Sequence, residues 1–241
     1  MAISHDAHTV KQFDIQLTNL RNQVQEMGGL VEDQIQNAIK ALDNEDITAA
    51  REVIARDQII NGMQVKVDED SVSMIALRQP LGSDLRLIMS LSKIVTDLER
   101  IGDEAEKIAR MTVKTYDGAG SPPNAKLLRD VQPMSKLAAN MLHNCLDALA
   151  RLDVEKAVEV AQGDDELDQE FQSALRRLIT YMMEDPRTIG HAISVIFIIK
   201  ALERIGDHSK NIAEYIIYLV KGKDVRHVKM DVLVQDALAV E

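Results

Sequence analysis

The hexapeptide LERIGD occurs twice in this chain of 241 residues, at 98–103 and again at 202–207. The match continues beyond both copies, because Ile-Ala pairs at 108–109 and 212–213 stand at the same offset of 104 residues, the distance from 98 to 202. Self-similarity at a fixed offset is the sequence signature of a repeated structural unit. The repeat therefore predicts that the chain arose by tandem duplication, and that each half folds in the same way.

The upstream part of the two halves also aligns, at an offset of 107 residues. The change of three residues falls in the turn predicted before the third helix of each half, where insertions are well tolerated. Five positions share this second offset, namely Asp46 with Asp153, Ala50 with Ala157, Glu52 with Glu159, Val53 with Val160 and Asp57 with Asp164.

Apolar residues recur at helical spacing along nearly the whole chain, and the breaks between the periodic runs are few. Hydrophobic residues make up 46% of the chain but aromatic residues only 3%, a composition typical of long helices. The pattern predicts an all-α fold of two tandem three-helix bundles, each antiparallel with an apolar seam. The six long helices are expected at about 13–43, 46–76, 84–116, 125–151, 153–183 and 187–221.

The segment YDGAGSPPN at 116–124 is the richest cluster of turn-forming residues and indicates a linker between the halves. We therefore predict a first repeat at 1–118, a linker at 119–123, a second repeat at 124–222 and a short, partly helical tail at 223–241.

Charge and apolar content exclude several classes of protein. The net charge of −11 and the absence of a Lys/Arg stripe argue against nucleic-acid binding. No run approaches the roughly 18 apolar residues that a membrane span requires, and the N-terminus lacks a signal-peptide core. The single cysteine, Cys145, is expected to be a buried small apolar residue in a reducing compartment. These features predict a cytoplasmic protein that associates with membranes only through partners.

Each LERIGD copy carries two features that destabilise a helix. Glu99 and Asp103, like Glu203 and Asp207, are four residues apart, so their like charges stack on one helix face. The glycine in each copy costs a further ~1 kcal/mol in a helix interior. A duplicated combination of this kind implies a compensating interaction. For the two glycines, Gly102 and Gly206, close helix packing is the expected explanation.

A second set of acids has the same spacing on the preceding helix of each repeat. Asp164 and Asp168 form such a pair, and their counterparts in the first repeat are Asp57 and Asn61. If these faces meet the LERIGD faces, oxygen ligands converge in each bundle. Hard oxygen ligands favour Mg, Ca, Mn or Fe, and carboxylates also hold Zn, so the identity of the metal stays open.

One alternative to a metal site remains. The acids could form a solvated face paired with Arg100, Lys107, Arg204 and Lys210. The Glu-x-x-His pattern of ferritin-like di-iron sites is absent, because Gly102 and Gly206 occupy the histidine position; only His208 is close enough in sequence to approach an acidic group. No phosphate loop, nucleophile elbow or Cys–His pairing is found, so we predict that the protein is not an enzyme.

The two ERIGD copies, together with the segments RQP at 78–80, DLR at 84–86 and YMMED at 181–185, resemble the PhoU family. The resemblance covers residues 10–228, and the family comprises accessory and regulatory proteins of bacterial phosphate transport. It implies two three-helix bundles related by pseudo-twofold symmetry, in a dimer. It also implies metal-binding E(D)xxxD motifs, which correspond here to Glu99 with Asp103, Glu203 with Asp207 and Asp164 with Asp168. The pair Asp57 and Asn61 departs from that motif by one amide.

The resemblance further implies a function, which composition and spacing alone do not. Such a protein would be a negative regulator of the phosphate-starvation response and a modulator of phosphate uptake. It would be an adaptor between the ATPase subunit of a phosphate ABC transporter and a sensor histidine kinase. A metal-free structural adaptor and a metal-dependent enzyme acting on phosphate compounds are the two alternatives.

Overall fold

The computed structural model describes residues 11–117 and 122–238. These residues form helices, turns and loops and contain no strand, which confirms the all-α prediction. The six long helices begin and end within a few residues of the expected positions, with one exception discussed below. The elements are α1 (Lys11–Asp43), α2 (Ile47–Arg78), α3 (Ser83–Tyr116), α4 (Val131–Arg151), α5 (Val154–Glu184), the 3-10 turn η1 (Pro186–Thr188), α6 (Ile189–Lys221) and α7 (Met230–Leu238).

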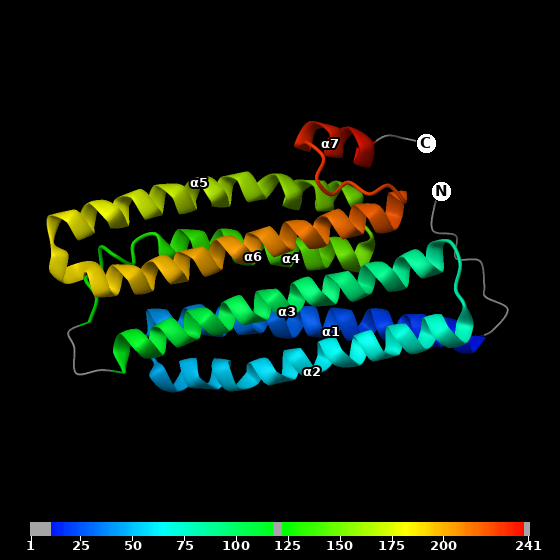
Figure 1. Ribbon diagram of the computed structural model, residues 1–241, viewed down its shortest axis with the longest axis horizontal. Coiled ribbons are helices and arrows are strands. Elements are labelled where there is room, and N and C mark those ends of the chain that lie inside the picture. The colour runs from blue at the N-terminus through cyan, green and yellow to red at the C-terminus, as the bar shows by residue number, and fades with distance from the viewer. Residues whose placement is uncertain (1–10, 118–121, 239–241) are drawn as a thin grey trace.

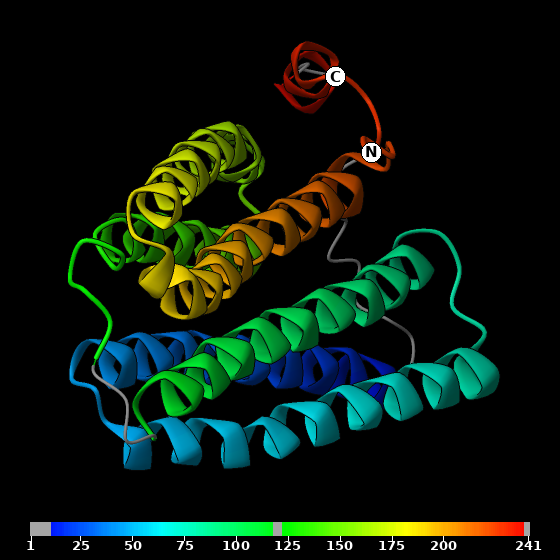
Figure 2. The same cartoon turned by 60° about the vertical axis from the view of Figure 1, so that its left-hand side comes forward.

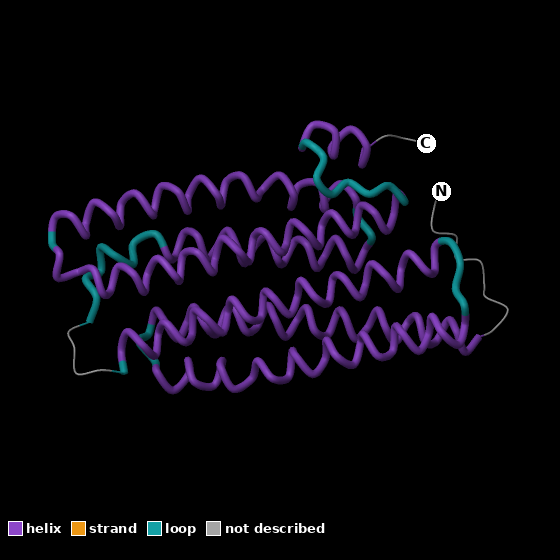
Figure 3. Tube along the Cα trace, viewed as in Figure 1, coloured by secondary structure: helices purple, strands orange, loops and turns teal. Residues whose placement is uncertain are grey.

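The long helices form two antiparallel bundles of three, one per repeat (Figure 1). Helices α1, α2 and α3 pack on one another, as do α4, α5 and α6. The loops lie at the ends of the helices, so almost the whole length of each bundle is helical (Figure 3). The predicted architecture of two tandem three-helix bundles is therefore confirmed.

The third helices of the two repeats, α3 and α6, form the centre of the molecule. Each packs on both other helices of its own bundle, and the two pack against each other (Figure 2). The apolar residues of the duplicated motif, Leu98 and Ile101 on α3 and Leu202 and Ile205 on α6, are all fully buried. One stripe of each third helix thus faces its own bundle, and a second stripe faces the other repeat.

Polar contacts cross this central interface as well. The His208 imidazole Nδ1 lies 2.8 Å from an Asp97 carboxylate oxygen, and Arg204 Nε lies 2.9 Å from a Glu104 oxygen. Asp97 and Glu104 are on α3, whereas Arg204 and His208 are on α6, so the two helices run antiparallel. Asp97 and Glu104 are both buried. Since burying an unpaired carboxylate is costly, these contacts stabilise one relative position of the repeats.

Two aspartates fix equivalent helix starts. Asp46 accepts a hydrogen bond from the Ala49 amide, and Asp153 accepts one from the Lys156 amide, each at 3.0 Å. Both are N-caps, which satisfy amides that the first helical turn leaves without a partner. The offset of 107 residues between the halves therefore pairs residues with the same structural role.

The start of the fourth helix was predicted wrongly. It was expected at 125, but α4 begins at Val131, and residues 125–130 form successive turns. Asn124 accounts for this, because its side chain accepts a hydrogen bond from the Lys126 amide and its carbonyl accepts one from Leu127. Such a local turn competes with helix formation.

The predicted linker lies mostly outside the described residues, which end at 117 and resume at 122. The tail expected at 223–241 contains the short helix α7, which packs on α5 (Figure 1). Val225, Leu233 and Ala237 hold the tail in place, since each is buried. A helix with the length and apolar character needed to cross a membrane is absent from the described ranges.

Two adjacent glycines in α1 are expected to respond oppositely to alanine. Gly29 is exposed with no neighbouring atom where a Cβ would lie, so Gly29→Ala should raise the free energy of unfolding by about 0.5–1 kcal/mol. Gly28 is buried against Leu146 of α4, and a Cβ there would overlap that side chain. Gly28→Ala should therefore gain less or lose stability. Urea unfolding of both variants measures the difference, and equal gains would contradict close packing of α1 on α4.

Candidate acidic sites in the two bundles

In the first bundle, Asp57 is surrounded by amide donors. Its two carboxylate oxygens accept hydrogen bonds from Gln34 at 3.1 Å and from Asn61 at 2.9 Å. Gln34, on α1, also donates to the Gly102 carbonyl at 3.4 Å. Asn61 occupies the position that corresponds to the second acid of the pair. It donates a hydrogen bond to the Asp57 carboxylate and does not add a second carboxylate. This buried acid already has the partners that its burial requires.

The LERIGD acids of the first bundle lie beside this group. Arg100 contacts Glu99 at 3.5 Å and Asp103 at 3.2 Å. One Glu99 oxygen, Oε2, is buried and accepts no hydrogen bond. Burial raises the pKa of Glu99, and the negative charge of Asp103 raises it further. The pKa of Asp57 is also raised, mainly by burial. The two LERIGD acids thus share an arginine.

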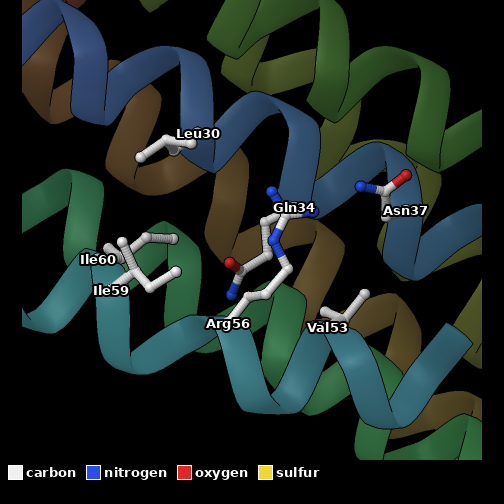
Figure 4. A pocket seen from close by; sticks show the side chains of 7 residues that line it. All are labelled: Leu30, Gln34, Asn37, Val53, Arg56, Ile59 and Ile60. Carbon is white, nitrogen blue, oxygen red and sulfur yellow. The ribbon is translucent and has the colours of Figure 1, made fainter.

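A small hollow lies on the other side of Gln34, between α1 and α2 (Figure 4). Its volume is about 20 Å³, room for about one water molecule. Leu30, Ile59 and Ile60 form its apolar part, and the Arg56 side chain reaches across it. This hollow is too small for any ligand larger than a water molecule.

The two motif glycines are close-packing positions, as expected. A Cβ on Gly102 would lie 3.3 Å from Ile60 and 3.4 Å from an Asp57 oxygen. A Cβ on Gly206 would overlap Leu167 of α5 and approach the Met141 sulfur. Met141 thus lies beside Gly206 in the second bundle, in the position that Gln34 has beside Gly102 in the first. The second helix of each bundle comes close to the motif because the motif has no side chain at this point.

In the second bundle, three carboxylates converge. Asp164 and Asp168 on α5 and Asp207 on α6 each offer an oxygen, and these three oxygens lie within 4.8 Å of one another. Asp164 is buried, Asp207 is half-buried and Asp168 is exposed, so the group opens to solvent on one side. Among the described residues, this is the group of acids that has the spacing to hold a metal ion. The predicted convergence of α5 and α6 acids is thus present.

Lysines rather than amides balance the second bundle. Lys210 Nζ lies 2.7 Å from an Asp164 oxygen. Lys200 Nζ contacts both oxygens of Glu203, and it also lies 5.2 Å from the centre of the Phe171 ring. Glu203 is therefore buried beside Asp207 but engaged by Lys200. A cation entering the group would compete with these lysines for carboxylate oxygens.

The carboxylates of the second bundle repel one another. Burial raises the pKa of Asp207, and the charges of Glu203 and Asp164 raise it further. The pKa of Asp168 is raised by the partial loss of water around its carboxylate, and then by the negative charges of Asp164 and Asp207. Both shifts mean that the ionised group is unfavourable without a counter-charge. A bound cation would supply that counter-charge.

The structure places the predicted residues in two unequal groups. Asp164, Asp168 and Asp207 come together with Glu203 beside them, whereas Asp57 is held by amides and apart from such a cluster. The sequence reasoning missed Gln34, which comes from α1 and carries no motif. His208, the one histidine whose position in the sequence allowed it to approach an acidic group, pairs with Asp97 of α3. Cys145 is buried as predicted, and burial raises the pKa of its thiol.

Comparison with known proteins agrees with this architecture. The PhoU domain family model matches residues 24–112 and 131–216, one match in each bundle. The phosphate-specific transport system accessory protein PhoU homolog of Pseudomonas putida is 48% identical over 221 residues, covering 92% of this chain and 85% of that protein. The accessory protein PhoU of Escherichia coli K12 is 43% identical over 232 residues, covering 96% of this chain and 95% of the relative.

Solved structures share the same fold. The crystal structure of PhoU from Pseudomonas aeruginosa superposes with a TM-score of 0.83 at 45% identity, over 88% of this chain and 100% of that one. The phosphate transport system regulatory protein PhoU from Streptococcus pneumoniae gives 0.79 at 30% identity, over 88% and 99%. With both family matches in register with the two bundles and with relatives similar over nearly their full length, this chain belongs to the PhoU family.

Proposed function

We propose that this protein is an accessory protein of phosphate-specific transport that represses the phosphate-starvation response and restrains phosphate uptake. The observation that carries the proposal is the sequence identity of 43–48%, over 92–96% of the chain, to proteins named as accessory proteins of the phosphate-specific transport system. In this role it is a cytoplasmic adaptor. Its partners are the ATPase subunit of a phosphate ABC transporter and a sensor histidine kinase.

The surface supports a docking role. Exposed apolar side chains follow one another at helical spacing at the start of α6, where Ile189, Ile193 and Phe197 are 41%, 42% and 56% exposed. Met183, at the adjoining end of α5, is 80% exposed. Contiguous exposed apolar groups of this kind are typical of protein interfaces. They suit a helical partner, or the second copy of a homodimer.

We propose further that the second bundle binds a divalent or trivalent metal ion through Asp164, Asp168 and Asp207, with Glu203 beside them. The close oxygens and their mutual repulsion support this. In the first bundle, Glu99 and Asp103 are candidates with Asp57, but the amides on Asp57 make this group a poorer fit. Fe, Mn, Mg and Zn all accept carboxylate ligands. The ion would supply positive charge that joins α5 to α6.

The functional proposal is tested by expressing this chain in an Escherichia coli strain that lacks its own PhoU. A phosphate-starvation reporter and the rate of phosphate uptake are measured in phosphate-rich medium. We expect this chain to restore low reporter activity and to reduce uptake. A derepressed reporter with normal amounts of the protein would contradict the regulatory role, provided that the Escherichia coli protein restores repression in the same strain.

Binding of purified transporter ATPase and of the kinase cytoplasmic part then distinguishes an adaptor from an enzyme. An adaptor is expected to bind both. The alternative, an enzyme acting on phosphate compounds, rests on the open side of the Asp168 group, and it predicts hydrolysis of a phosphoester by metal-loaded protein. Hydrolysis that disappears in Asp207→Asn would favour the enzyme.

A further inference from the structure

A cavity of about 240 Å³ lies between the two bundles. Helices α1 and α3 of the first repeat and α4 and α6 of the second all contribute to its wall. Its volume is somewhat below the ~300–1000 Å³ of typical small-molecule sites, so it suits a small ligand. A molecule bound here would contact both repeats at once.

The two sides of the cavity differ in chemistry. Four leucines of the apolar side, Leu87, Leu91, Leu149 and Leu219, are at most 7% exposed, and they come from α3, α4 and α6. The opposite side is a polar row on α1 that includes Arg21, Asn22 and Gln25. A wall that is apolar on one side, with a few convergent polar groups on the other, is the usual composition of a ligand site.

Arg21 is the residue that selects charge. It is half-buried, and burial lowers the pKa of its guanidinium, while the negative charge of Asp84 opposes that shift. The nearby guanidinium of Arg86 is committed to the end of α6, because its Nε donates to the Leu219 carbonyl at 3.1 Å. Thr18, at the end of the polar row, already donates its hydroxyl to the Asp14 carbonyl at 2.8 Å. A hydrogen-bond acceptor of a ligand in the cavity would therefore be within reach of the Arg21 guanidinium and of the side-chain amides of Asn22 and Gln25.

We propose that this cavity binds a small amphipathic carboxylate, with its carboxylate on Arg21 and its aliphatic chain against the leucines. A planar carboxylate fits the fork of an arginine with two parallel hydrogen bonds. An aliphatic chain removes apolar surface from water when it contacts Leu91 and Leu149. Since α1 and α4 face each other across the cavity, the ligand also stabilises the relative position of the two repeats.

The test is an NMR titration of the full chain with sodium hexanoate and, separately, with hexanamide, which has a similar shape but no charge. Saturable chemical-shift changes are expected with hexanoate. The Kd for hexanamide is expected to be at least about tenfold higher, because a charge-assisted hydrogen bond is lost. Arg21→Gln should weaken hexanoate binding by a similar factor. Ala150→Leu, at an exposed position on the cavity wall, should abolish binding by filling the space.

Arg176→Gln is the matched control, because it removes the same charge from an exposed position on α5 outside the cavity. It should bind hexanoate as the unmodified chain does. No saturable binding to the unmodified chain would overturn the proposal. Equal affinity for hexanoate and hexanamide would also overturn it, as would equal affinity of Arg21→Gln and Arg176→Gln for hexanoate. In either case Arg21 would not bind the carboxylate.

Discussion

Leu202→Ala is expected to lower the free energy of unfolding by about 2–5 kcal/mol. Leu202 is 0% exposed and lies on α6 at the centre of the molecule, where α6 packs on α4, α5 and α3. Truncation removes apolar contacts, and it leaves a cavity that the three surrounding helices cannot easily close. Its counterpart Leu98, also 0% exposed, should give a loss of similar size. Urea unfolding followed by circular dichroism measures both.

Leu77→Ala is the matched control for this prediction. Leu77 lies in a helix, as Leu202 does, but its side chain is 75% exposed. A surface substitution of this type usually changes stability by no more than about 0.5 kcal/mol. A loss below about 1 kcal/mol in both Leu98→Ala and Leu202→Ala would contradict tight packing at the centre, because buried leucines of this kind cost at least about 2 kcal/mol.

Adding Mn²⁺ to metal-free protein is expected to raise the free energy of unfolding by about 2.7 kcal/mol when the free ion is at 100 times its Kd. The proposed site exists only in the folded state, where Asp164, Asp168 and Asp207 converge, so an ion bound there would stabilise that state alone. Asp207→Asn should remove most of this gain. Asp165→Asn, which changes an exposed acid next to the group, should keep it, and so should Asp57→Asn in the first bundle. Thermal unfolding with elemental analysis of each variant provides the measurement.

The same substitution should act in the opposite direction in chelator. The folded-state pKa of Asp207 is raised above its ordinary 3.8, so folding favours the protonated form. Stability from this group is present at low pH and is lost as the pH rises through 3.8 toward the folded-state pKa. Asp207→Asn should therefore be more stable than the unmodified chain at neutral pH without metal. A variant that is less stable in chelator and unchanged in Mn²⁺ would contradict the metal site.

The sequence alone determined the duplication, the helical class and the acid pairs, because all three are local properties. Helical periodicity and caps such as Asp46 and Asp153 depend on residues within a few positions of each other. The start of α4 was predicted wrongly although it too is a local property. Over this short stretch the Asn124 turn competes with the helix, and periodicity does not show which of the two forms. Spacing of four residues sufficed to place Glu203 with Asp207 on one face.

Tertiary structure decided which acids form an open group. Gln34 reaches Asp57 and Gly102 from a different helix, and nothing in the spacing of the α1 residues marks it. Met141 occupies the corresponding position in the second bundle and offers no amide donor. The acids there are therefore close to one another, with Lys210 paired to Asp164. The pairing of His208 with Asp97, and the cavity beside Arg21, likewise depend on how α3 and α6 cross. Such contacts are set by the register and angle between helices, which local periodicity does not contain.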